Sequence, residues 1–356
     1  MDPGQSKNKS KNILVIVILA LLALSTLLYL ALIYALRLYP TIEVSQSSTL
    51  PKERGFSFSA VGDFGANSHT EKVLKQASSK TDFTLALGDF AYDQAENEEQ
   101  WCDFVHKNVG ETYPFMIVPG NHDTEGDSGF GRGHIERYSA CLPSRISNVI
   151  GSYPGRYYFD YKKTARIIVT APNLTVNTGE ASYATNSANY NWLAQTLDDA
   201  KSKDIPWVVL AMHENCITIG VKKCSIGEDI INLAVEKKVD LIFQGHEHGY
   251  MRSKQLQLGG KCPRITVANP NSKCTTSNED KYKKGSGSLM VINGTGGYPL
   301  REINVSRPES VYFSKWFGSN TNPTNGPSKV TVTKNKLSVS YTSTEGSTKD
   351  SFVVSR

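Results

Sequence analysis

From Gly55 onward, short hydrophobic runs alternate with longer polar stretches. The runs predict strands at residues 56–61, 83–87, 115–118, 167–169, 207–211 and 241–243, and the stretches between them favour helices near 68–79, 96–108, 132–140, 187–200 and 227–237. Strands that alternate with helices are typical of an α/β layered domain. From about residue 328 the pattern changes to short alternating strands at 329–333, 337–342 and 351–354, which predicts an antiparallel ending.

One segment near the N-terminus departs from this pattern. Residues 13–36 are 24 consecutive uncharged residues, mostly Leu, Ile, Val and Ala. A helix that crosses ~30 Å of hydrocarbon needs roughly 20 apolar residues, so a single transmembrane helix is expected before the α/β domain. A cleaved signal peptide, whose apolar core has only about 7–15 residues, is the alternative.

The charges beside residues 13–36 predict an orientation. Lys7, Lys9 and Lys11 precede the segment, and only Arg37 follows it closely. By the positive-inside rule we expect a single-pass membrane protein whose N-terminus is cytoplasmic and whose main domain is extracellular or lumenal. Its parts would be a tail (1–12), an anchor in the lipid bilayer (13–36), a stalk (37–54) and the α/β domain (55–356). Cleavage of the segment would instead give a secreted protein.

The remaining composition is that of an ordinary globular protein, with 39% hydrophobic and 21% charged residues. This composition excludes wholesale disorder and a long coiled coil. The formal net charge of +5 is mild for 356 residues, so no nucleic-acid partner is expected.

All six cysteines follow the apolar segment, on the side where an oxidising compartment would permit disulfides. Six cysteines allow fifteen pairings, and the sequence does not choose among them. We expect the nearest-neighbour arrangement, which is Cys102–Cys141, Cys216–Cys224 and Cys262–Cys274. Glycan acceptor patterns on the same side predict a glycoprotein, and they begin at Asn173, Asn293 and Asn304.

Five of the predicted strands end in a polar cluster with potential metal ligands. The clusters are Gly62-Asp63-Phe64-Gly65, Gly88-Asp89-Phe90-Ala91-Tyr92, Gly120-Asn121-His122-Asp123, His213-Glu214 and Gly245-His246-Glu247-His248. In open α/β sheets ligands bind beyond the carboxyl ends of the strands, so we expect the five clusters to meet at one edge. Oxygen and nitrogen donors without thiolate suit iron, manganese or zinc. Seven donors are too many for one catalytic ion, but they suit two ions that share a carboxylate, as in enzymes that displace groups at phosphorus.

The ordered set Asp-x-Gly, Gly-Asp-x-x-Tyr, Gly-Asn-His-Asp, a strand-end His and Gly-His-x-His resembles the binuclear metallophosphoesterase superfamily. Tyr92, three residues after Asp89, makes the chain similar to the purple acid phosphatase branch, which includes the tartrate-resistant acid phosphatases. The resemblance covers about residues 55–356, with specific motifs between 63 and 248. It implies a four-layer α/β/β/α sandwich of two mixed sheets, with the metals at their carboxyl edge.

The resemblance also implies a role for each residue of the motifs. Fe(III) would be bound by Asp63, Tyr92 and His248, a divalent ion (Fe(II), Zn or Mn) by Asn121, His213 and His246, and both ions by Asp89 as a bridge. His122 would meet the substrate. Relatives with a second substrate-facing histidine carry it in the loop after the position of His213, but residues 214–228 contain none, so Glu214 or His134 would have to assist His122.

A charge count independently favours iron. Asp63, Asp89 and an ionised Tyr92 supply three negative charges, and a bridging hydroxide adds a fourth. A ferric–divalent pair carries five positive charges and leaves one to attract a phosphate anion, whereas two divalent ions leave none. A free phenol has a pKa near 10 and needs a strong Lewis acid to ionise at neutral pH.

The expected function is therefore acid phosphatase activity on phosphorylated small molecules or phosphoproteins. A metal-bound hydroxide would attack the phosphate monoester, and His122 would protonate the departing alkoxide. The fold also hosts phosphodiesterases and nucleotidases with two divalent metals, many of which carry His where this chain has Gly65. A non-catalytic anchored binding protein is a further alternative, but such a protein is expected to have lost ligands.

Overall fold

The computed structural model describes residues 19–34, 55–124, 133–176, 181–276 and 280–356. The chain divides into two units, Met1–Lys52 and Glu53–Arg356. In the first unit, residues 19–34 form a helix whose large apolar side chains are exposed. None of the helices within the described residues has the length and apolar character needed to cross a membrane. The predicted tail 1–12, the predicted stalk 37–54 and residues 13–18 and 35–36 of the predicted anchor lie outside the described residues.

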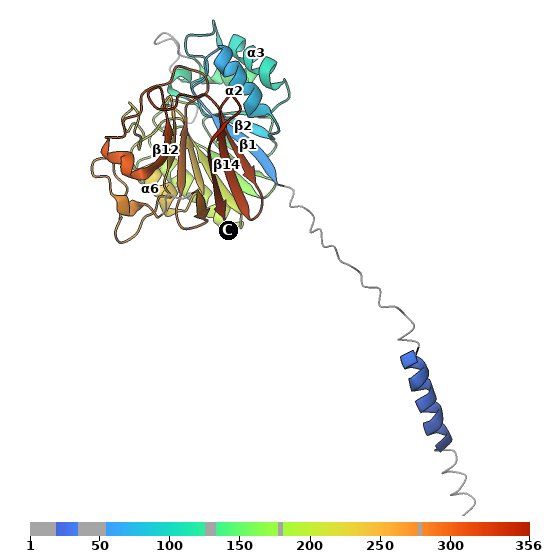
Figure 1. Cartoon of the computed structure of the whole chain (residues 1–356). Coiled ribbons are helices and arrows are strands. Elements are labelled where there is room, and N and C mark those ends of the chain that lie inside the picture. The colour runs from blue at the N-terminus through green and yellow to red at the C-terminus, as the bar shows by residue number, and fades with distance from the viewer. Residues whose placement is uncertain (1–18, 35–54, 125–132, 177–180, 277–279) are drawn as a thin grey trace, which may run out of the picture. The chain divides into compact units, whose positions relative to one another are not determined.

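The second unit contains two mixed sheets (Figure 1). The first sheet has seven strands in the order β10 (Lys281–Lys283), β15 (Thr348–Ser355), β14 (Lys336–Thr342), β13 (Ser328–Val332), β1 (Phe56–Val61), β2 (Phe83–Ala86) and β3 (Phe115–Ile117). Strands β1, β2 and β3 run parallel, and β1 pairs antiparallel with β13. The antiparallel C-terminal strands β13, β14 and β15 confirm the predicted ending.

The second sheet has eight strands. Their order is β12 (Phe313–Phe317), β9 (Tyr250–Ser253), β11 (Leu289–Asn293), β8 (Leu241–Gln244), β7 (Trp207–Ala211), β6 (Ala165–Val169), β5 (Arg156–Tyr161) and β4 (Ile150–Ser152). The central strands β6, β7, β8 and β11 are parallel, and antiparallel strands complete both edges. The parallel part of each sheet therefore presents its carboxyl ends on one side.

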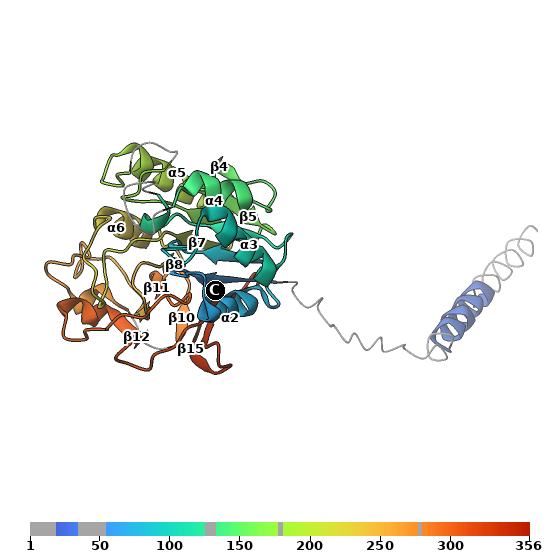
Figure 2. The same cartoon turned by 90° about the horizontal axis from the view of Figure 1, so that it is seen from above.

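Alternate residues of the strands face different layers, as the period of two in a β-strand requires. In β7, Val209 belongs to the core between the sheets, whereas Leu210 packs toward α5 (Ala188–Ser202) and α6 (Asp229–Glu236). In the other sheet, Phe58 faces the inner core and Val61 packs with α2 (Ser68–Ser78), α3 (Glu98–Val109) and α4 (Ile135–Cys141). In Figure 2, β7 and β8 lie between α2 and α5. Three buried cores between four layers confirm the α/β/β/α sandwich.

All five predicted helices and all nine predicted strands are present, with ends that differ by a few residues. Strands β4, β5, β9, β10, β11 and β12 were not predicted, and most of them are short or lie near the edges of the sheets.

The three nearest-neighbour disulfides are confirmed. The glycan prediction at Asn293 is wrong, because its side chain is fully buried and donates to Ala60, Gly326 and Ser328. Asn173 and Asn304 are exposed.

Candidate metal centre

The predicted site residues lie at the carboxyl ends of parallel strands from both sheets. In the first sheet, Asp63 follows β1, Asp89 and Tyr92 follow β2, and Asn121 and His122 lie in a short 3-10 helix (Asn121–Asp123) after β3. In the second sheet, His213 follows β7, and His246 and His248 follow β8. Backbone hydrogen bonds join the two edges, since the Gly62 N–H donates to the Asn293 carbonyl at the end of β11.

Three predicted ligands, Asp63, Tyr92 and His248, gather on the side of one carboxylate oxygen of Asp89. The phenol oxygen of Tyr92 lies 3.0 Å from Asp89 Oδ2 and 2.9 Å from Asp63 Oδ1. His248 Nε2 is 3.0 Å from the same phenol oxygen and 3.3 Å from Asp63 Oδ1. These atoms form the group in which the sequence placed a ferric ion.

Around the other oxygen of Asp89 a second group assembles. His213 Nε2 lies 3.2 Å from Asp89 Oδ1, 3.2 Å from Asn121 Oδ1 and 3.2 Å from His246 Nδ1. The candidate ligand atoms of Asp89, His213 and His246 all lie within 4.8 Å of one another, as do those of Asp63, Asp89 and His248. The structure thus brings all seven predicted ligands together in two groups that share Asp89.

Two of the histidines are oriented by backbone carbonyls outside the centre. His213 Nδ1 lies 2.6 Å from the Leu87 carbonyl, and His248 Nδ1 lies 2.9 Å from the Pro299 carbonyl. An Nδ1–H that donates to a carbonyl leaves Nε2 with a free lone pair, which is the form that binds metals. Both Nε2 atoms therefore point into the centre as ligands would.

The loops hold four of the seven residues in the left-handed region of backbone space. Their φ angles are 62° for Asp63, 55° for Asp89, 52° for Tyr92 and 69° for His246. Asp and His tolerate this region, but a bulky side chain such as Tyr rarely adopts it. Backbone strain of this kind is found at functional sites that the surrounding structure holds in place.

Burial and mutual charge perturb the titration of the centre. Burial raises the pKa of Asp63 to about 7, and the charge of His213 only partly opposes it. Burial would also raise the pKa of Asp89, but the charge and hydrogen bond of His213 outweigh it, so this pKa lies below its usual range. Against the effect of burial, Asp89 raises the pKa of His213 to about 10. Burial, followed by the charges of Asp63 and Asp89, raises the pKa of the Tyr92 phenol well above 10.

This donor set fits two cations. It consists of oxygen and imidazole nitrogen donors without thiolate, which suits iron, zinc or manganese. Two buried carboxylates and a phenol at hydrogen-bond distance are costly to ionise together unless positive charge lies between them. The same charge would allow His213 and His246, whose ring nitrogens face each other, to be neutral together.

Tyr298 is a site residue that the sequence did not predict. Its ring stacks on the ring of Tyr92, with the centroids 3.7 Å apart and an interplanar angle of 13°. Its backbone N–H donates to the Asp63 carbonyl at 3.1 Å. A pattern in the sequence could have located it. The apolar run before Asn293-Gly-Thr-Gly-Gly predicts a further strand, and the loop after that strand carries glycines in place of ligands.

Asp123 also has a role that the sequence did not predict. Its buried carboxylate accepts the backbone N–H groups of Asp89 and Gly120 at 2.8 Å and of Phe90 at 2.9 Å. It therefore holds the loop after β2 against the loop after β3. A Cβ on Gly120 would lie 2.2 Å from the Asp89 nitrogen, so this close approach requires glycine.

The three candidates for contact with substrate differ in their surroundings. The His122 ring lies 4.6 Å from the Tyr92 ring, and its backbone N–H donates to Asp89 Oδ1 at 2.9 Å. Glu214 is buried and accepts the amide of Asn173 at 2.9 Å. His134 Nδ1 lies 3.1 Å from a Glu98 carboxylate oxygen. His122 thus contacts two of the seven predicted ligands, Tyr92 and Asp89.

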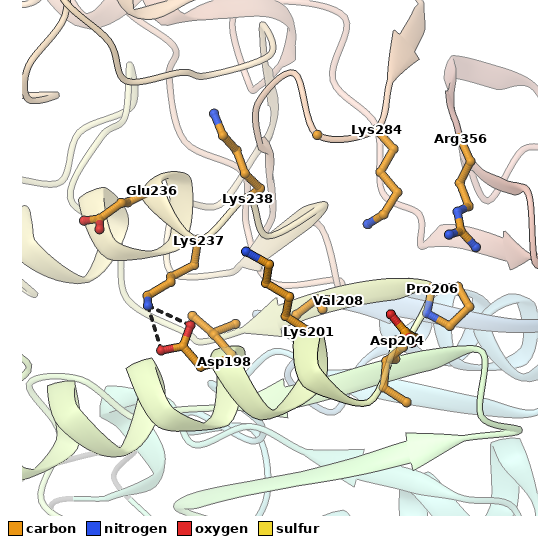
Figure 3. Close-up of a pocket in the computed structure, with 13 residues that line it drawn as sticks. Asp198, Lys201, Asp204, Pro206, Val208, Glu236, Lys237, Lys238, Lys284 and Arg356 are labelled. Atoms are coloured by element: carbon orange, nitrogen blue, oxygen red, sulfur yellow. Dashed lines mark hydrogen bonds and ion pairs between the residues drawn. The ribbon is translucent and has the colours of Figure 1, made fainter.

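A separate cavity of about 370 Å³ lies at the opposite ends of β7 and β8 (Figure 3). Lysine and arginine side chains surround it, and Lys237 is paired with Asp198 at 2.7 Å. Pro206 immediately precedes β7, so this cavity is at the amino end of the strand whose carboxyl end carries His213. The described residues that line it include no histidine, and the predicted centre is elsewhere.

Comparison with known proteins identifies the family. The sequence profile of the calcineurin-like phosphoesterases matches residues 57–250. The chain belongs to that family. It is 27% identical over 219 residues to purple acid phosphatase 21 of Arabidopsis thaliana, which covers 58% of this chain and 47% of the relative. It is 25% identical over 219 residues to Fe(3+)-Zn(2+) purple acid phosphatase 12 of the same plant, with 56% and 44% covered.

Solved structures agree with the family assignment at the level of the fold. A purple acid phosphatase from yellow lupin (Lupinus luteus) seeds superposes with a TM-score of 0.62 at 18% identity, covering 86% of this chain and 54% of that one. The predicted resemblance to the purple acid phosphatase branch of the metallophosphoesterases is therefore confirmed. The chain spans about half the length of the curated relatives that it matches.

Proposed function

We propose that this chain is a membrane-anchored acid phosphatase that hydrolyses phosphate monoesters at a binuclear centre of Fe(III) and a divalent ion. The substrates would be phosphorylated small molecules or phosphoproteins. The observation that carries the proposal is the position of Asp89, whose two carboxylate oxygens each face one group of donors. A shared carboxylate between two such groups is the arrangement used for displacement at phosphorus.

In this proposal Asp63, Tyr92 and His248 would hold the ferric ion, and Asp89 would be shared by the two ions. The divalent ion would be Fe(II), Zn or Mn, held also by Asn121, His213 and His246. Two such cations polarise phosphoryl oxygens and lower the pKa of water, so that hydroxide is available near neutral pH. An ionised Tyr92 favours iron, because burial and two carboxylates oppose the ionisation of this phenol and a strong Lewis acid is needed to overcome them.

The protein's own groups orient the substrate and move the proton. His122 is partly exposed beside Tyr92 and is the candidate general acid for the departing alkoxide. The Pro299 and Leu87 carbonyls keep the histidine ligands in one tautomer. The stack of Tyr298 on Tyr92 excludes water from one face of the phenol.

The main rival is a phosphodiesterase or nucleotidase of the same fold with two divalent ions. Many of those enzymes carry a histidine at the position of Gly65. Here that position has a φ of 92°, and a Cβ would lie 2.4 Å from the side-chain oxygen of Gln94. A histidine would be strained at this φ and would have to displace Gln94, so the backbone favours glycine here, as the phosphatase proposal expects.

The anchor remains part of the proposal. It is supported by the 24 uncharged residues at 13–36 and by the exposed leucines of the helix at residues 19–34. Three disulfides in the second unit suit an extracellular or lumenal compartment. A secreted protein, formed by cleavage of residues 13–36, is the alternative.

The proposal is tested by assaying residues 55–356, purified after secretion, on a panel of phosphomonoesters, phosphodiesters and nucleotides, with metal analysis of the same sample. We expect two metals per chain, at least one of them iron, and the highest rates on monoesters. A preference for diesters with two divalent metals would support the rival. Two bound metals without any hydrolysis would indicate the non-catalytic binding protein.

A further inference from the structure

The segment Tyr298–Arg301 wraps around one of the predicted ligands. The Pro299 carbonyl is 2.9 Å from His248 Nδ1, and the Arg301 N–H donates to the His248 carbonyl at 2.8 Å. The Tyr298 ring lies 5.3 Å from the His248 ring, in an edge-on arrangement. Arg301 is therefore held beside the centre through its backbone.

The Arg301 side chain has no protein partner among the described residues. Its guanidinium makes no hydrogen bond or ion pair there, and its Nη1 atom is buried. Two buried arginines of the second unit have carboxylate partners, since Arg166 is paired with Asp160 at 2.7 Å and Arg252 with Asp350 at 2.7 Å. A buried donor without an acceptor costs about 1–3 kcal/mol, so its persistence calls for an explanation.

The carboxylate of Glu247, the residue before His248, does not supply the acceptor. The buried Glu247 carboxylate instead accepts the backbone N–H groups of Val221 and Lys222 and the hydroxyl of Thr218.

We propose that Arg301 is a substrate-binding residue whose guanidinium binds an anionic group of the phosphoester beside the metal centre. A planar guanidinium forms paired, charge-assisted hydrogen bonds to phosphate or carboxylate oxygens. The anionic group is either the phosphoryl group itself or a second phosphate or carboxylate on the same substrate. This inference rests on the proposed function and extends it, since it gives the site a protein residue that selects for negative charge.

The test compares the metal-loaded wild type with Arg301→Gln, Arg301→Lys and the control Lys223→Gln, which removes one exposed positive charge from a nearby loop. Calorimetry gives the Kd of inorganic phosphate, of propylphosphonate and of 3-phosphonopropionate, which adds a carboxylate to a phosphonate of the same chain length. We expect Arg301→Gln to raise at least one Kd by about 10- to 100-fold. Arg301→Lys should recover part of the loss, and Lys223→Gln should change no Kd more than about twofold.

The pattern of losses identifies the group that Arg301 binds. Equal losses for all three ligands assign it to the phosphoryl group, whereas a loss confined to 3-phosphonopropionate assigns it to a second anion. Unchanged Kd values in Arg301→Gln, or a loss of metal from that variant, would overturn the inference while the wild type still hydrolyses phosphoesters. A metal-loaded wild type that binds none of the ligands and hydrolyses no phosphoester would overturn the proposed function as well.

Discussion

The Tyr92 phenol oxygen lies 3.0 Å from Oδ2 of Asp89, inside a pocket where both side chains are almost completely buried. Without a cation the phenol must keep its proton, because burial and the charges of Asp63 and Asp89 raise its pKa. A cation between the two oxygens would reverse that preference. Tyr92 and Asp89 are therefore the pair on which the identity of the metals depends.

Asp89→Asn is expected to be the most damaging single change in the centre. It removes the charge that both donor groups share and leaves His213 without the carboxylate that raises its pKa. We expect loss of one or both metals, and a fall in kcat/KM beyond the roughly 10- to 100-fold that is typical when only an outer partner of a ligand is removed. Metal analysis and steady-state kinetics check both.

The control for this change is Asp103→Asn, which removes a charge from an exposed position of α3. It should retain two metals and the full rate. If Asp89→Asn also kept two metals and a normal rate, the binuclear proposal would be wrong.

Asp123→Asn tests a residue that acts through the backbone of others. The amide can accept through only one oxygen, so at least one of the N–H groups of Asp89, Phe90 and Gly120 loses its acceptor. We expect the affinity for the divalent ion to fall by about 10- to 100-fold, with a smaller fall in kcat once metal is saturating. Metal titration followed by kinetics at excess metal separates the two. A loss of kcat that excess metal does not restore would contradict a positioning role.

Metal uptake should strengthen as pH rises. In the metal-free protein the pKa of Asp63 is about 7 and that of His213 about 10, and both must lose a proton to act as ligands. For each proton that the metal displaces, the apparent metal affinity rises about tenfold per pH unit. This holds over the pH range in which that ligand is protonated in the metal-free protein. We expect a slope near one proton between pH 7 and 9 from His213 and a steeper slope below pH 7, where Asp63 contributes. Zinc titrations at several pH values measure this slope, and a pH-independent affinity would contradict it.

The sequence was informative where ligands follow buried parallel strands. A run of apolar residues that ends in a polar residue, with or without a glycine between them, places that residue at the sheet edge. Asp63, Asp89 and His213 could therefore be placed there before the fold was known. The four-layer arrangement came from the resemblance to the family, because alternation alone does not specify how sheets stack.

Other features depend on contacts that no local pattern encodes. All three residues of β4 are exposed, and Ile150 alone does not make a hydrophobic run. Strand β11 is an apolar run like the others, but the loop after it bears glycines and no ligand. Tyr298 and Arg301 gain their places only when that loop, about 235 residues after Asp63, folds over the same edge.

Deleting residues 1–36 behind an exogenous secretion signal tests the anchor. The three disulfides and all predicted ligands lie in the second unit, so we expect soluble, metal-loaded and active protein. The full-length chain should instead fractionate with membranes and resist extraction at high salt. Recovery of the full-length product in solution, with an N-terminus near Arg37, would show that residues 13–36 are a cleaved signal.

Tyr92→Phe tests whether the visible absorption of the centre can be lost while phosphatase activity remains. If Tyr92 binds iron as a phenolate, the oxidised wild type should absorb broadly in the visible through charge transfer from ligand to metal. The variant keeps the ring that stacks on Tyr298, so the loop should remain folded while the absorption band disappears. It also loses one negative ligand, so the affinity for ferric iron should fall, while Asp63, Asp89 and His248 remain to hold an ion. We therefore expect a colourless protein with reduced but measurable phosphatase activity.

Tyr298→Leu is the matched control, since it removes the stack on Tyr92 but keeps the Tyr92 phenol and should keep the absorption band. A colourless, fully metallated and active wild type would contradict the ferric assignment and leave Tyr92 as a neighbour of two divalent ions.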